Sequence, residues 1–188
     1  MSDQADVDYG PLTELIGKWE GDKGLDIAPD PDGVEQNPYY ETITFAAAGA
    51  VENAESQTLV AVHYRQIVSR KSDHRVFHDQ TGYWMWDAQS HVMMHSLTIP
   101  RAVGLLAGGK HSGERNSDGS FIFDVVAGIN NKDWQIVQSA FMRDHARTIA
   151  FQMHIVVGKG ELSYSQKTTV DIYGKIFEHT DENKLKAV

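Results

Sequence analysis

The sequence is dominated by short runs in which apolar and polar residues alternate, each ended by glycine, asparagine, aspartate or proline. Alternation with a period of two is typical of β-strands with one buried face, and turn residues between such runs indicate hairpins. Helical periodicity is scarce, and its one convincing segment is PLTELIG, where Pro11 suits a first turn and Gly17 a stop. About ten strands are predicted, at Lys18–Asp26, Tyr39–Ala47, Gln57–Val68, Gly82–Asp87, His91–Thr98, Arg101–Lys110, Ser120–Ala127, Trp134–Met142, Arg147–Val157 and Glu161–Tyr173.

The joins between these runs predict how the strands are connected. NSDG, GINNKD, RDHA and GKG favour tight turns, whereas the proline-rich APDPDGVEQNP and the charged SRKSDHRV are expected to be exposed loops. Consecutive hairpins with one short N-terminal helix predict an all-β fold, an antiparallel up-and-down barrel. A barrel of about ten strands is too wide for its own side chains to fill, so it should enclose a cavity. An immunoglobulin-type sandwich has a similar strand count but does not favour this nearest-neighbour order.

Length and composition indicate one domain of 188 residues. We expect the barrel and its N-terminal helical turn to span residues 11–173, and residues 174–188 to form a C-terminal segment at the barrel mouth. The chain has no cysteine, which excludes disulfides, thiolate metal sites and covalent c-type haem. A net charge of −9 without a cluster of basic residues argues against a nucleic-acid partner.

The start of the chain and its hydropathy bear on its location. The segment MSDQADVDYG is acidic and polar, unlike a signal peptide. No apolar stretch approaches the roughly 20 residues that a membrane helix needs. We therefore expect a cytoplasmic protein with no membrane partner, and both a monomer and a homodimer stay open.

The alternation also predicts which side chains face inward. Trp19, flanked by glycines in GKWEGDKG, is expected to cover the closed end of the barrel, as in lipocalin-like barrels. In TIAFQMHIVVG the opposite face carries His154, which should therefore point to solvent. The inner row of this strand is expected to be Ile149, Phe151, Met153, Ile155 and Val157.

Four segments occur in an order that resembles one known family. GKWEG is followed by a His-x-x-x-Gly-aromatic-aromatic strand in VFHDQTGYWMWD, then by GLLAGGKHSG and by ELSYSQKTT near the C-terminus. This order resembles the nitrobindin family, haem-binding β-barrel proteins described as fatty-acid-binding-protein-like. The resemblance covers nearly the whole chain, and the inserted APDPDGVEQNP and SRKSDHRV make this a divergent member.

The resemblance implies a ten-stranded barrel that binds haem b non-covalently near its open end. In this family a histidine close to the C-terminus ligates the iron, and ferric haem reacts with nitric oxide or isomerises peroxynitrite to nitrate. The resemblance places the metal-ligand role on His179, in GKIFEHTDENKL, and places His78 on the opposite side of the haem. Tyr83 and Leu105 are the other cofactor-binding candidates, and no catalytic residue is assigned.

The residues themselves leave alternatives open. His179 could be a solvated surface residue, or could lean over the cavity with Asp181 or Glu178 on its other ring nitrogen. His78 could hydrogen-bond a bound diatomic or peroxynitrite oxygen, or could cap a strand in which Gly82 marks a bulge or a close backbone approach. The alternative function is a carrier for a fatty acid or another apolar molecule without redox chemistry.

Overall fold

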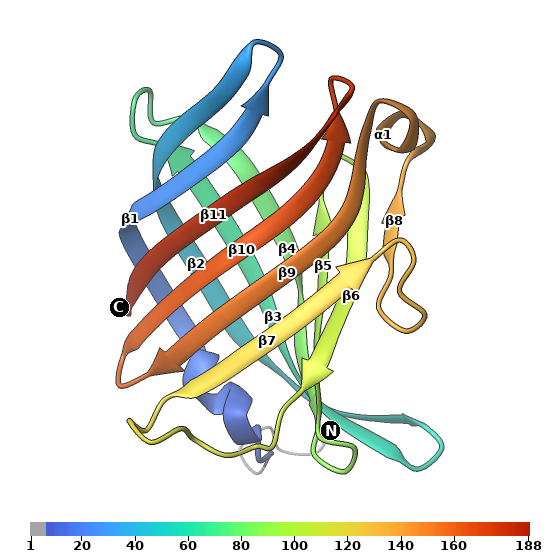
Figure 1. Cartoon of the computed structure of the whole chain (residues 1–188). Coiled ribbons are helices and arrows are strands. Elements are labelled where there is room, and N and C mark those ends of the chain that lie inside the picture. The colour runs from blue at the N-terminus through green and yellow to red at the C-terminus, as the bar shows by residue number, and fades with distance from the viewer. Residues whose placement is uncertain (1–6) are drawn as a thin grey trace.

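The structure, a computed structural model that describes residues 7–188, confirms the predicted barrel (Figure 1). Among these residues eleven strands form one sheet, and all except β8 close into an antiparallel ten-stranded barrel in chain order. Pairing of β5 with β6 and of β1 with β11 completes the ring. The elements are a 3-10 helix, η2 (Gly10–Leu15), then β1 (Gly17–Asp30), β2 (Gly33–Ala54), β3 (Gln57–Arg70), β4 (Val76–Asp87), β5 (Val92–Ile99), β6 (Val103–Lys110), β7 (Phe121–Gly128), β8 (Ile136–Gln138), α1 (Ala140–His145), β9 (Ala146–Gly158), β10 (Glu161–Ile172) and β11 (Lys175–Ala187).

The C-terminal segment differs from the expectation, because residues 175–187 form a full barrel strand and not a tail at the mouth. β11 pairs with β10 from Ile172↔Lys175 to Glu161↔Lys186, and its other edge pairs with β1. The sequence does not predict this strand, because the side chains on its inward face are a mixture of charged, polar and apolar residues. A barrel can close only if both edges find a partner, so β11 satisfies two edges that would otherwise be exposed.

The strands on either side of the two expected long loops are also longer than predicted. β1 continues to Asp30 and β2 begins at Gly33, and the turn between them is tightened because Asp30 Oδ1 accepts the Asp32 N–H at 3.0 Å. β4 likewise begins at Val76, so SRKSDHRV contributes only a short turn. The hairpin and the turn surround the open end of the barrel in Figure 1, together with the β10–β11 turn and α1.

The strand predicted at Trp134–Met142 is wrong in its second half. Only Ile136–Gln138 is extended, and the chain then forms α1. Ser139 caps this helix, since its hydroxyl accepts the Met142 N–H at 3.3 Å. Serine is a favoured N-cap residue, and this local hydrogen bond competes with strand pairing.

The opposite end of the barrel is closed, as predicted, by Trp19. Its side chain is buried, and its indole N–H donates to the Leu15 carbonyl at 2.7 Å. Leu12 and Leu15 of η2 are fully buried beside it. The short helix lies at the bottom of Figure 1, so the barrel has one plugged end and one end without such a plug.

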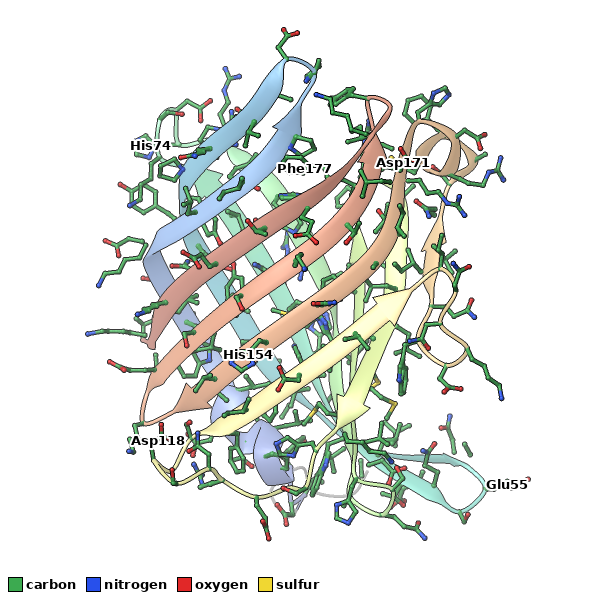
Figure 2. All side chains as sticks on the ribbon, viewed as in Figure 1. Glu55, His74, Asp118, His154, Asp171 and Phe177 are labelled. Atoms are coloured by element: carbon green, nitrogen blue, oxygen red, sulfur yellow. The ribbon has the colours of Figure 1, made fainter. Side chains whose placement is uncertain are left out.

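The inward and outward faces follow the predicted alternation along most of β9. Phe151, Met153, Ile155 and Val157 are buried, whereas His154 is exposed and lies on the outer surface (Figure 2). Ile149 leaves the predicted inner row because the register between β9 and β10 shifts near Thr169, which turns Thr148 inward instead. Neither helix in the described part of the chain is long and apolar enough to cross a membrane.

Gly82, in the middle of β4, confirms the expectation of a close backbone approach. A Cβ added there would lie 1.9 Å from the Ser96 carbonyl oxygen of β5. Such a contact cannot be relieved by rotating a side chain, because the obstacle is backbone. Gly33, at the start of β2, has no atom within 4 Å of the same added position.

We therefore expect Gly82→Ala to lower the free energy of unfolding by about 1–3 kcal/mol through overpacking between β4 and β5. Gly33→Ala is the matched control and should change it little. Urea denaturation followed by tryptophan fluorescence measures both. Equal stability of the two variants would contradict the close packing of β4 on β5.

Candidate functional site

The barrel encloses a cavity of about 330 Å³ in the half away from η2, near the lower end of the size range of small-molecule sites. Apolar side chains from the strand ends line its mouth, among them Ile99, Val103 and Ile172. Polar side chains such as Gln66, Gln80 and Tyr164 line its interior. Among the described residues of this lining none is lysine or arginine. Larger hollows lie over outward-facing side chains and are surface grooves.

His179 lines this cavity from β11 and is held by a carboxylate of the adjacent strand. Its Nε2 lies 2.5 Å from Asp26 Oδ1 on β1 and 3.6 Å from Asp181 Oδ2. Asp26 and Asp181 are directly paired across the two strands, and His179 and Asp181 share one face because they are two residues apart. Of the two acids expected near His179, Asp181 is there, whereas Glu178 points outward to Lys167 at 3.0 Å.

Burial and mutual charge set the protonation of this cluster. Burial alone would raise the pKa of Asp26, but hydrogen bonds with His179 and Asn37 outweigh burial and lower it. Burial alone would lower the pKa of His179, but the hydrogen bond to Asp26 and the charge of Asp181 raise it. Burial raises the pKa of Asp181 to about 7, against the attraction of His179. The cluster is therefore a compact ion pair of Asp26 and His179, joined by a hydrogen bond to a second carboxyl, Asp181, whose pKa is raised.

His78 faces the same cavity from β4 and begins a buried hydrogen-bond chain. Its Nε2 lies 2.9 Å from Gln80 Oε1, and Gln80 Nε2 donates to the Tyr64 hydroxyl at 2.9 Å. The Tyr64 hydroxyl is in turn 2.8 Å from Nε2 of His95. His95 is fully buried and stacks on Trp84, with ring centroids 4.3 Å apart.

The contact with Gln80 fixes which ring nitrogen of His78 carries the proton. Burial lowers the pKa of His78, so the imidazole is neutral at pH 7. Since Gln80 presents an oxygen to Nε2, that nitrogen carries the proton and donates it. Nδ1 is then left with a lone pair, so a neutral His78 that keeps its contact with Gln80 can accept a further hydrogen bond but cannot donate one. Burial also lowers the pKa of His95 to about 3, which keeps that imidazole neutral as well.

A buried carboxylate lies below the polar floor of the cavity. Glu41 is 2% exposed and has no cationic partner within residues 7–188; its oxygens accept hydrogen bonds from the Tyr164 hydroxyl at 3.0 and 3.1 Å and from the Asn183 amide at 2.6 Å. Gln66 donates to it as well. Burial raises the pKa of Glu41 to about 7, although these three donors work in the opposite direction.

The structure brings three of the four predicted site residues together. His179, His78 and Leu105 all line the cavity. Tyr83 does not, because it is 44% exposed on the outer face of β4, where its ring lies 5.2 Å from that of His63. Alternation alone could not decide whether Tyr83 or Trp84 points into the barrel. In the structure Trp84 is buried, so Tyr83 points outward. Sequence reasoning missed Asp26, which carries no motif and meets His179 only through barrel closure.

The fold and this cavity define a ligand-binding β-barrel, and comparison with known proteins gives its family. The THAP4-like, haem-binding β-barrel domain matches residues 8–187. The chain therefore belongs to this family, that of the nitrobindins, which confirms the resemblance predicted from its motifs.

Eleven chains of solved structures match this one. Among them, the crystal structure of Rv2717c from M. tuberculosis covers 94% of both chains with a TM-score of 0.70 at 18% sequence identity, a level at which the likeness shows the fold alone. No curated protein sequence matches significantly.

The raised pKa of Glu41 predicts a pH dependence of stability. Folded Glu41 keeps its proton up to pH about 7, whereas an unfolded glutamate loses it near pH 4.5. Between these values the folded state binds more protons, so the free energy of unfolding should fall as pH rises. Glu41→Gln removes this contribution, so the free energy of unfolding should fall less steeply with pH in the variant. Part of the pH dependence should remain, because the pKa of Asp181 is raised as well.

Urea denaturation at pH 5, 6 and 7 measures this slope, with Glu178→Gln as a control that removes an exposed carboxyl. A slope in Glu41→Gln equal to that of the wild type would show that Glu41 is already ionised at pH 5.

Proposed function

We propose that this chain binds haem b non-covalently in the cavity, with His179 as the protein ligand of the iron and His78 on the facing wall. We further propose that the ferric haem takes up nitric oxide or isomerises peroxynitrite to nitrate, which would make the protein a peroxynitrite isomerase. The observation that carries the proposal is that two imidazoles from distant strands, β4 and β11, line one cavity in a haem-binding family. They are near enough for the charge of His179 to lower the pKa of His78.

The chemistry of the lining fits this group. Haem needs apolar walls for the macrocycle and at least one imidazole for the iron, and the mouth of the cavity and His179 supply them. Because the described lining contains no lysine or arginine, the haem carboxylates fit only at the mouth, in contact with solvent. Nε2 of His179 is engaged by Asp26, so iron ligation through that nitrogen has to replace this hydrogen bond.

The protein's own residues would shape what happens at the iron. Ferric haem, when bound, supplies a coordination position that can take nitric oxide or a peroxynitrite oxygen. Neutral His78 directs its N–H to Gln80 and so offers the ligand a lone pair, while the apolar mouth limits the entry of water. As parts of the same proposal, the protein acts in the cytoplasm as a monomer or homodimer, on a small molecule and without nucleic acid or membrane.

A fatty-acid carrier is a weaker candidate. The carboxylate of a fatty acid entering head first would find no lysine or arginine in the described lining, and the charge of His179 is already paired with Asp26. Burying an anion that has no free cationic partner is strongly unfavourable. The carrier alternative is thus restricted to apolar molecules without a buried negative charge.

Replacing the proposed ligand tests haem binding. We expect wild-type protein titrated with hemin to develop a Soret band. Loss of a residue that merely supports a metal ligand lowers metal affinity about 10–100-fold, so His179→Ala, which removes the ligand itself, should weaken hemin binding at least as much. His154→Ala, on the outer face of β9, is the matched control and should bind hemin like the wild type. The absence of a Soret change in the wild type would reject haem binding. Equal affinities of the two variants would reject His179 as the ligand.

Two adjacent leucines test where hemin binds. Leu105 points into the cavity, whereas Leu106 is 39% exposed on the outer face. Leu105→Trp should fill part of the cavity and abolish hemin binding, while Leu106→Trp should leave it intact. The same titration measures both, with circular dichroism to verify the fold. Unchanged hemin binding by a folded Leu105→Trp would place the haem elsewhere.

A further inference from the structure

Asp26, His179 and Asp181 form a compact set of metal-type ligands within the wall of the cavity. One ligand atom from each lies within 4.8 Å of the other two. The set is held by strand pairing: Asp26 on β1 opposes Asp181 on β11, and His179 is two residues earlier on the same face. Because the ladder fixes all three Cα positions, the side chains converge without depending on a loop.

Neighbouring amides orient both carboxylates. Asn37 donates to Asp26 Oδ2 at 2.9 Å, and Gln166 donates to Asp181 Oδ2 at 3.3 Å. Hydrogen bonds of this kind, behind ligating carboxylates and imidazoles, are a regular feature of metal sites. They leave Asp26 Oδ1 directed at the imidazole, and a side-chain hydrogen bond joins the Asp181 carboxyl to Asp26.

The charge around this set is a separate observation that indicates a cationic ligand. Two carboxylates share one imidazole, and Asp26 is only 3% exposed. No lysine or arginine lines the cavity among the described residues, and the buried Glu41 adds a third acid below its floor. Buried charges in proteins are generally paired or coordinate metals.

A histidine–aspartate pair on the outer surface of the barrel, His154 and Asp124, can be compared with the inner set. His154 Nδ1 lies 2.7 Å from Asp124 Oδ1, a contact of the same type as that between His179 and Asp26. It has a single carboxylate, and both side chains are well exposed. In the described part of the chain, the inner set alone combines an imidazole, two carboxylates and an adjoining cavity with space for further ligands.

We propose that Asp26, His179 and Asp181 bind a divalent transition-metal ion directly, without haem. One nitrogen and two carboxylate oxygens are a donor set that Zn²⁺, Fe²⁺ and Mn²⁺ accept, with the remaining positions open to water or a small ligand in the cavity. Metal bonds of this class are about 2.0–2.2 Å long, which puts ligand atoms about 3.0–3.5 Å apart. The separations of 2.5 and 3.6 Å from Nε2 bracket that spacing, so small side-chain rotations suffice.

The site goes beyond the proposed function and makes the two occupants exclusive, because haem iron and a free ion would both use His179. A protein loaded with hemin should therefore take up no ion at this site. The two proposals can fail separately. Co²⁺ binding without a Soret band would support the ion site and overturn the haem proposal, whereas a Soret band without Co²⁺ binding would support the haem proposal and overturn the ion site.

The test is a titration of the whole, haem-free chain, purified without a histidine tag, with Co²⁺ followed by absorption and calorimetry. We expect the wild type to bind one Co²⁺, and Zn²⁺ to displace it. Asp181→Asn and Asp26→Asn should each weaken the affinity at least about tenfold, by comparison with the 10–100-fold effect of losing even an outer partner. Asp124→Asn, in the outer pair, is the matched control and should bind like the wild type.

Three results would overturn the proposal: no stoichiometric Co²⁺ uptake by the wild type, uptake unchanged in both inner variants, or equal loss in Asp124→Asn. Far-UV circular dichroism and hemin titration of the same variants separate loss of the site from loss of the fold. Asp181→Asn keeps His179, so a folded variant should still give a Soret band while it loses Co²⁺.

Discussion

The rest of the structure depends on the pairing of β11 with both β1 and β10. This pairing closes the barrel, satisfies two strand edges and gives the cavity its last wall. It also determines the chemistry of that wall, because it turns His179 and Asp181 inward and sets them against Asp26, more than 150 positions earlier in the chain. The site is therefore formed by a long-range contact, and its ligand-type atoms are held by backbone hydrogen bonds of the sheet and not by a mobile loop.

The interior that results is divided by polarity along the barrel axis. Trp19 and η2 close one end with apolar packing, and the mouth at the other end is also apolar. Between them lie Glu41 and His95 in hydrogen-bonded networks with Tyr164 and Tyr64. Buried polar groups without partners are costly, so near-complete satisfaction of these networks is what makes a polar layer tolerable in a barrel core. One of these networks also contacts His78 through Gln80 and so holds its imidazole in one orientation in the cavity wall.

The sequence predicted the features that arise from local alternation: the barrel, Trp19 at its closed end, the inward row of β9 from Phe151 onward, and outward His154. It missed β11 as a strand because the inward row, which includes His179, Asp181 and Asn183, lacks an apolar repeat. It placed Tyr83 on the wrong face because alternation gives the period of a strand and not its phase; the phase is set by burial of Trp84. Asp26 and Glu41 could not be assigned from sequence, because their partners are brought to them only when the barrel closes.

A crystal structure of the chain grown with hemin would show whether His179 and His78 face a common ligand from opposite walls of the cavity. We expect density for the macrocycle between β11 and β4, with Nε2 of His179 on the iron and no longer on Asp26. A macrocycle bound to the outer surface, or a cavity without hemin in which His179 still contacts Asp26, would contradict it.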